Sequence, residues 1–276
     1  MGTRQLAVAP SSQRWLSLPG TPVLNYHGLT RGSSGFNGHQ GRFEVSQNSF
    51  ADHLRHIAAS GCRVILAEEL PHSSDSSTPK VQSAALTFDD GRASDHDVAY
   101  AMLCDANLSA TFFINSATVD TPGHLTWLQL KEMSRSGMSI QSHGHDHVDL
   151  ARLSTDQLDY QLRRSKAEIE DRLGREVSLL ALPYGSKPQH MISTAMRLGY
   201  KAICSSGGRL ARSSSVIIDR VCIYSNTSLQ QFAAVLRGSP VFFGKRACRA
   251  ALLCLPKQIA FGLFPSAVNR WRSRNE

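Results

Sequence analysis

Short apolar segments alternate along the chain with segments in which apolar residues keep a helical spacing. The apolar segments predict strands at residues 22–27, 63–66, 84–88, 110–114, 138–141, 177–182, 202–204 and 216–224. The clearest helix covers residues 154–174, where Ser154 and Gln157 form a capping box and Gly174 ends the apolar pattern. Another helix is predicted to begin at Ser49 and to end at Gly61. Further helices are predicted near residues 98–103, at 126–137 and before 199.

Strand, helix and strand therefore follow one another at the spacing of a parallel sheet or barrel. A chain of 276 residues, 41% of them hydrophobic, is long enough to bury one large core. In parallel α/β folds the reactive side chains lie in loops at the carboxyl ends of the strands. The polar residues that follow each predicted strand are thus the first candidates for a functional site.

Two polar motifs follow predicted strands. Thr-Phe-Asp-Asp-Gly at residues 87–91 supplies two adjacent carboxylates, and Ser-His-Gly-His-Asp-His at residues 142–147 supplies histidines four positions apart. One aspartate and two histidines can bind a divalent metal ion and leave positions open for water and substrate. Because adjacent side chains on an extended segment point in opposite directions, the second aspartate is free to accept a proton. The pattern is typical of a metal-assisted hydrolase, and its ligands suit zinc, and also cobalt, nickel or iron.

Each motif also has a purely structural interpretation. Asp-Gly is a common turn dipeptide, and histidine clusters occur in solvated polar loops. However, both motifs follow strands of one alternating pattern, and so does Pro-Tyr-Gly at residues 183–185. This joint placement favours a site over two unrelated loops.

The ordered motifs resemble those of polysaccharide deacetylases of the NodB-homology group, carbohydrate esterase family 4. The resemblance covers roughly residues 20–230 and rests on residues 87–91, 143–150 and 182–185, with supporting matches at 22–27, 110–113 and 125–127. It implies an α/β fold, a distorted (β/α) barrel, in an enzyme that removes acetyl groups from N-acetylated sugars.

The resemblance implies a role for each matching residue. Asp89 would be the catalytic base, and the metal ligands would be Asp90, His143 and His147. The backbone N–H of Tyr184 would help to hold the oxyanion. His145 lies between two ligand positions and is not a ligand in the family pattern.

Two positions depart from the family pattern. The arginine that orients the base usually lies two residues before the proline of the third motif, and here that position is Ala181. The general acid is commonly a late histidine, but this chain has no histidine after His190. His27, at the end of the first strand, is the candidate that could replace it, with a purely structural role as the alternative. His124 is a weaker candidate.

The formal net charge of +8 lies in the C-terminal part of the chain. Residues 220–276 contain nine Lys and Arg and one acidic residue, and the rest of the chain is neutral. Basic and apolar residues are mixed in residues 244–274, a composition that suits peripheral contact with an anionic membrane surface; a helix packed on the barrel is the alternative. Nucleic acid is not an expected partner, because the basic residues lack interleaved aromatic residues.

These patterns divide the chain into three parts. Residues 1–20 are predicted to be a flexible N-terminus, 21–235 the deacetylase domain and 236–276 a basic, partly amphipathic extension. The six cysteines are scattered, which indicates free thiols in a reducing compartment. No segment has the pattern of a signal peptide or the ~18 apolar residues of a membrane span. We therefore expect a cytoplasmic protein, in peripheral contact with the inner membrane face.

The functional hypothesis is a metal-dependent hydrolase in which a metal-bound water attacks the N-acetyl group of a glycan during exopolysaccharide biosynthesis. One alternative is a C–N hydrolase of the same superfamily that acts on a small amide or imide. The other is a glycan-binding pseudoenzyme, favoured by the absence of the family arginine and of the late histidine.

Overall fold

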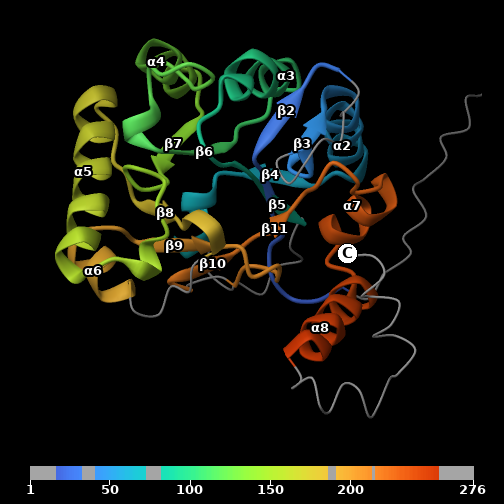
Figure 1. Ribbon diagram of the computed structural model, residues 1–276. Helices are drawn as coiled ribbons and strands as arrows, with labels where there is room; N and C mark the ends of the chain where they lie inside the picture. Colours follow the sequence, from blue (N-terminus) through green and yellow to red (C-terminus); the bar gives the residue numbers. More distant parts are fainter. Residues whose placement is uncertain (1–16, 33–40, 73–81, 186–190, 213–214, 255–276) are drawn as a thin grey trace, which may run out of the picture.

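The computed structural model describes residues 17–32, 41–72, 82–185, 191–212 and 215–254. These residues form a barrel of nine parallel strands surrounded by helices (Figure 1), so the predicted distorted (β/α) barrel is confirmed. The strands of the barrel are β1 Val23–Tyr26, β4 Arg63–Ile65, β5 Ser83–Phe88, β6 Thr111–Ile114, β7 Ser139–Ser142, β8 Leu179–Ala181, β9 Ala202–Ser205, β10 Ile217–Asp219 and β11 Val221–Cys222. A separate parallel pair consists of β2 Gly28–Thr30 and β3 Glu44–Ser46.

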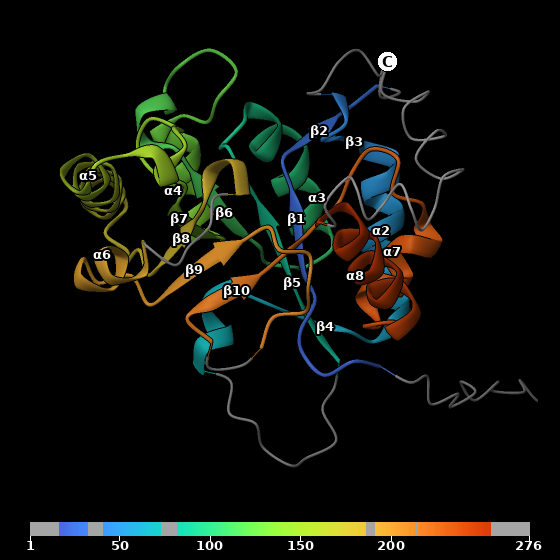
Figure 2. The same cartoon turned by 60° about the horizontal axis from the view of Figure 1, so that its bottom comes forward.

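The helices lie outside the barrel, with α4, α5 and α6 on one side, α2, α7 and α8 on the other, and α3 between the two groups (Figure 2). They are α2 Gln47–Ser60, α3 Ala101–Asp105, α4 Trp127–Arg135, α5 Thr155–Leu173, α6 Ile192–Arg197, α7 Leu229–Leu236 and α8 Pro240–Cys254. A π-helical segment, Asp95–Tyr100, leads directly into α3.

A single segment of the chain closes the barrel. The strand order is β10-β9-β8-β7-β6-β5-β1-β11, and β4 pairs with the first half of β5. β10 pairs with β9, whereas β11 pairs with β1, and only Arg220 separates the two strands. The prediction of one strand at residues 216–224 is therefore wrong in detail, because the segment changes partner at Arg220.

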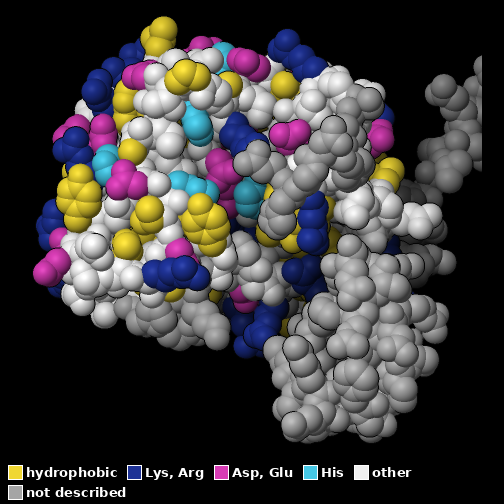
Figure 3. All heavy atoms as spheres, in the orientation of Figure 1, with side chains coloured by type: hydrophobic (Ala, Val, Ile, Leu, Met, Phe, Trp, Pro, Cys, Tyr) yellow, Lys and Arg dark blue, Asp and Glu magenta, His cyan; other side chains and the backbone are white. Residues whose placement is uncertain are grey.

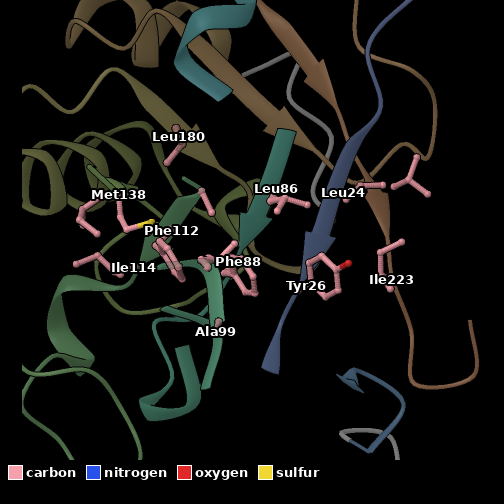
Figure 4. Close-up of a cluster of buried hydrophobic side chains, with 14 of the residues drawn as sticks. Leu24, Tyr26, Leu86, Phe88, Ala99, Phe112, Ile114, Met138, Leu180 and Ile223 are labelled. Atoms are coloured by element: carbon pink, nitrogen blue, oxygen red, sulfur yellow. The ribbon is translucent and has the colours of Figure 1, made fainter. Parts of the chain in front are cut away.

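Alternate residues of each strand face the helices or the barrel interior. The outward side chains are large and form the main core, in which Phe88 stacks on Tyr26 and on Phe112 at ring distances of 5.2 and 4.8 Å (Figure 4). Burial of each such side chain contributes roughly 1.5–3 kcal/mol. Several inward side chains are small, namely those of Ala85, Ala181, Ala202 and Cys204. Small inward residues leave room for polar groups inside the barrel.

Capping residues fix the helix ends. The predicted capping box of Ser154 and Gln157 is present, and α5 ends at Gly174 with a left-handed φ of 64°. α2 begins earlier than predicted, because the Ser46 hydroxyl accepts a hydrogen bond from the Ser49 N–H and caps the helix at residue 47. α7 was not predicted, although Ser228 and Gln231 form a capping box at its N-terminus, as Thr126 and Gln129 do at the start of α4.

Parts of the predicted N-terminal segment and C-terminal extension lie outside the described residues, as do most of the predicted loops at 32–41 and 72–80. The described part of the extension forms α8, which packs against the rest of the molecule through the buried Phe243. The five cysteines whose side chains are described are free thiols. Across the described ranges, no helix combines the length and apolar character needed to span a bilayer.

Candidate active site

The predicted site residues lie at one end of the barrel, where the parallel strands reach their carboxyl ends. Asp89 and Asp90 follow β5, the histidine motif follows β7, Tyr184 follows β8 and His27 follows β1. Histidine and acidic side chains gather near the centre of this face (Figure 3). The parallel register of the strands thus brings together residues that are far apart in the sequence.

Asp90, His143 and His147 form a compact group of potential metal ligands. Asp90 Oδ1 lies 3.5 Å from His143 Nε2 and 3.3 Å from His147 Nε2. One ligand atom from each of the three residues lies within 4.8 Å of the others. His145 is not part of this group; its Nδ1 is 2.7 Å from the Ser116 hydroxyl.

Neighbouring groups orient each of these side chains. His143 Nδ1 is 3.0 Å from the Ala181 carbonyl oxygen, so Nδ1 donates a hydrogen bond to it and the ring turns Nε2 toward Asp90. His147 Nδ1 is 3.3 Å from the Tyr184 hydroxyl. Arg92 donates to Asp90 Oδ2 at 3.3 Å, which leaves Oδ1 directed at the histidines. Burial raises the pKa of Asp90, but hydrogen bonds from His143 and His147 outweigh this effect and hold the pKa well below its usual range.

Three of the site residues have left-handed backbone conformations. The φ angles are 78° at Asp90, 54° at His147 and 58° at Tyr184. Such angles in residues other than glycine cost on the order of 1–3 kcal/mol each and cluster at functional sites. The loops are therefore shaped to present particular side chains rather than for local stability.

Asp89 is buried, and its carboxylate faces the Arg220 side chain. The Arg220 guanidinium makes two parallel hydrogen bonds to its carboxylate, at 2.7 and 2.9 Å, and Asn25 Nδ2 donates at 3.0 Å. Burial raises the pKa of Asp89, but the charge and hydrogen bonds of Arg220 together with smaller contributions from His143 and His27 outweigh burial and lower the pKa to about 2. Asp89 is therefore a rigidly held carboxylate that is ionised at neutral pH.

Arg220 was not among the predicted site residues. It is fully buried at the junction of β10 and β11, where it also lies over the Phe113 ring, 5.1 Å from the ring centroid. In the family pattern the arginine that orients the base lies at the position of Ala181. Here Ala181 is a small interior residue, and Arg220 takes the place of that arginine beside Asp89. The signal in the sequence was a charged residue within an apolar strand segment, because a buried charge requires a partner.

His27 lies beside Asp89, with Nε2 3.8 Å from Asp89 Oδ2. Its ring packs against Phe43 at 4.7 Å, and its buried Nδ1 has no hydrogen-bond partner among the described residues. Burial lowers the pKa of His27, although Asp89 and Asp90 act in the opposite direction. His124, the weaker candidate, instead contacts the Thr121 hydroxyl through Nδ1 at 3.1 Å.

Comparison with known proteins identifies the same family as the sequence motifs. The family model described as polysaccharide deacetylase matches residues 76–203. YxkH of Bacillus subtilis (strain 168), classed by name as a polysaccharide deacetylase, is 25% identical over 218 residues, which is 78% of this chain and 75% of YxkH.

Two solved structures share the barrel over most of the chain. The Streptococcus pyogenes deacetylase PplD, solved in complex with acetate, has a TM-score of 0.73 and 25% identity, and covers 80% of this chain and 99% of PplD. A de-N-acetylase from Aggregatibacter actinomycetemcomitans has a TM-score of 0.70 and 20% identity, and covers 79% of this chain and all of that chain. At 20% identity the second likeness shows the fold alone.

Proposed function

The chain belongs to the polysaccharide deacetylase family, a family of hydrolases, and on this premise we propose that it removes N-acetyl groups from an N-acetylated carbohydrate. The observation that carries the proposal is the placement of two separate units on one barrel end. One unit is the group of Asp90, His143 and His147, and the other is the Asp89 carboxylate held by Arg220. A metal-assisted hydrolysis requires both units side by side.

The ligand group fits a divalent metal ion. Two imidazoles with their Nε2 atoms turned toward one carboxylate oxygen form a donor set that suits zinc, cobalt, nickel or iron, with zinc as our proposal. The hydrogen bond from His143 to the Ala181 carbonyl fixes the tautomer that such binding requires. An ion held here would lower the pKa of a water molecule and polarise the amide carbonyl of the substrate.

The residues of the chain would move the protons and stabilise the developing charge. Asp89 would accept a proton from the attacking water, and Arg220 holds the carboxylate ionised and in a fixed orientation. The backbone N–H of Tyr184 would donate to the oxyanion that develops on the carbonyl oxygen. His27 lies within reach of Asp89 and would pass the proton to the nitrogen that leaves as an amine.

The test is acetate release from N-acetylglucosamine oligomers by the purified protein, with and without added zinc or cobalt. We expect metal-dependent release that falls by at least about 1,000-fold in Asp89→Asn, because the base is removed. Asp105→Asn, at an exposed position of α3, is the matched control and should retain the release.

Other outcomes would change the proposal. Release from small amides or imides but not from glycans would identify a C–N hydrolase with another substrate. Tight metal binding and glycan binding without any release would identify a pseudoenzyme. The complete ligand group and the paired Asp89 favour turnover over both.

We further propose that the enzyme works in the cytoplasm at the inner membrane face, on a glycan intermediate of exopolysaccharide synthesis. The support is the uneven charge, since residues 220–276 account for the whole net charge of +8. Exposed basic side chains of α8, Lys245 and Arg249, would contact anionic headgroups.

A further inference from the structure

One arginine lies directly beside the ligand group without belonging to it. The Arg92 guanidinium donates to Asp90 Oδ2 through Nη2 at 3.3 Å and through Nε at 3.4 Å, so two nitrogens share one oxygen. The other oxygen, Asp90 Oδ1, lies 3.5 Å from His143 Nε2 and 3.3 Å from His147 Nε2. The two oxygens of this carboxylate therefore have different partners, one a cation of the chain and the other the two ligand histidines.

The Arg92 side chain is held in this position by the strand pair β2 and β3. Its Nη1 lies 3.7 Å from Glu44 Oε1, at the start of β3. Gly28, the first residue of β2, leaves room for the arginine, because an added Cβ at this position would lie only 3.3 Å from Arg92 Cδ. The guanidinium thus bridges two carboxylates, and its side chain is only 29% exposed.

The backbone of Arg92 is anchored by Asp95. The Asp95 side chain is fully buried, and its Oδ2 accepts a hydrogen bond from the Arg92 N–H at 3.1 Å. The Asp95 N–H donates in return to the Arg92 carbonyl at 2.9 Å. Asp95 also begins a π-helical segment, a rare conformation that is frequent at functional sites. Exposed ion pairs of mobile side chains contribute little, but here both the backbone and the side chain of the arginine are fixed.

The arrangement bears on how a carboxylate binds a metal ion. A carboxylate can bind through one oxygen or through both, and the second mode fills a position that water and substrate need. Hydrogen bonds to the outer oxygen of a ligand carboxylate fix its orientation and tune the properties of the ion. A guanidinium on Asp90 Oδ2 occupies the oxygen that the second mode would require. Its positive charge also repels a nearby cation.

We propose that Arg92 is a positioning residue that restricts Asp90 to a single metal–oxygen bond, made by Oδ1. The inference rests on the metal dependence proposed above and assigns the residue that keeps positions on the ion open. Arg92 acts through Asp90 and is given no contact with the substrate. Its charge lowers the affinity for the metal ion and keeps the bound ion more reactive.

The test compares the unmodified protein with Arg92→Met, which has neither the charge nor the hydrogen-bond donors. We expect the visible absorption band of bound Co²⁺ to shift and weaken, since a second oxygen ligand raises the coordination number. Affinity for Zn²⁺, measured by competition with a chelating dye, should rise about tenfold because a nearby positive charge is removed. The kcat of acetate release should fall about tenfold, in the range typical for the loss of a group that orients a ligand.

Two further variants serve as controls. Arg31→Met removes an exposed arginine that follows β2 and donates to the Asp97 carbonyl, so it should leave the spectrum, the affinity and kcat unchanged. Arg92→Lys keeps the positive charge, so the Zn²⁺ affinity should stay near that of the unmodified protein.

The outcomes separate the inference from the function on which it rests. An unchanged Co²⁺ spectrum in Arg92→Met, or weaker metal binding by this variant, would overturn the inference, because a purely structural arginine would give these results. An equal rise of affinity in Arg92→Lys would also contradict it. Metal binding without release from any glycan by the unmodified protein would contradict the deacetylase function, and the spectrum and the affinity would still decide on Arg92. No binding of Co²⁺ or Zn²⁺ by the unmodified protein would overturn both.

Discussion

Arg220 and Asp89 form a buried charge pair whose geometry, rather than charge alone, should matter for catalysis. Arg220→Lys keeps the positive charge but cannot make the two parallel hydrogen bonds seen at 2.7 and 2.9 Å. Because a base displaced by about 1 Å can cost about 100-fold in rate, we expect a loss of kcat of that order. Steady-state kinetics of acetate release would measure it. Arg209→Lys, at an exposed position, is the control, and an unchanged kcat in Arg220→Lys would contradict the assigned role.

The three histidines of one loop allow a second prediction at the scale of single residues. His143→Ala and His147→Ala each remove a ligand atom, so we expect metal affinity to fall by at least about 100-fold in both. His145→Ala is the matched control, because His145 contacts Ser116 and Glu168 rather than Asp90. Competition with a chelating dye would measure the affinities without any need for turnover. Equal losses in all three variants would indicate that the loop, not the ligand set, had been damaged.

The residues of the site were predictable from the sequence to different degrees. Asp89, Asp90, His143 and His147 stand in motifs at strand ends, and parallel strands bring such ends together in any barrel of this kind. The contact of Arg220 with Asp89 joins residues 131 positions apart, and it depends on which strand closes the barrel. No local pattern encodes that choice, so the partner of Asp89 became visible only in the structure.

At the scale of elements, the contact between α2 and α7 should make stability depend on pH. His53 of α2 stacks on Phe232 of α7 at 4.0 Å, and its Nδ1 lies 3.1 Å from the Tyr26 hydroxyl, within hydrogen-bond distance. Burial lowers the pKa of His53 to about 4. The unfolded chain, with a histidine pKa near 6.5, binds more protons between these values, so stability falls as the pH drops below about 6.5.

We expect this residue alone to cost about 2 kcal/mol of unfolding free energy between pH 7.5 and pH 5. His53→Gln cannot titrate, and its side-chain amide can still form a hydrogen bond with Tyr26. The difference in stability between the unmodified protein and His53→Gln should therefore shrink by that amount on acidification, as measured by urea unfolding. If the unfolding free energies of the two proteins instead changed in parallel with pH, His53 would take up its proton in the folded state as readily as in the unfolded chain, which would contradict the prediction.

Element boundaries followed local chemistry wherever one signal dominated. The capping boxes at Thr126 and Ser154 fixed the starts of α4 and α5 as predicted. At the start of α2, Ser46 and Ser49 are both possible N-cap residues. The Ser46 hydroxyl accepts a hydrogen bond from the Ser49 N–H, so the helix begins three positions earlier than a cap at Ser49 would allow. The single strand predicted at residues 216–224 became two, because the partner strands, and not the apolar pattern, decide where pairing stops.

At the scale of the whole molecule, the alternation of strands and helices in the sequence was enough to predict a barrel. It was not enough to predict which segment closes the barrel. The distribution of charge also concerns the whole molecule. The basic part of the chain begins at Arg220, in the segment that closes the barrel. The described part of that basic region is α8, which packs on α7 and keeps Lys245 and Arg249 exposed. The barrel and its site are therefore joined rigidly to a positively charged surface.

This surface predicts binding to anionic membranes by the full chain. We expect cosedimentation with vesicles that contain phosphatidylglycerol, weak binding to pure phosphatidylcholine, and release at high salt, because screening removes the attraction. Lys245→Glu combined with Arg249→Glu should weaken binding at least about tenfold, since each basic side chain near the surface contributes about 1 kcal/mol. The same reversal at Lys131 and Arg135, exposed basic positions on α4, is the matched control. Equal binding to neutral vesicles would contradict an electrostatic attraction. Equal effects of both reversals would mean that the net charge, and not α8, governs binding.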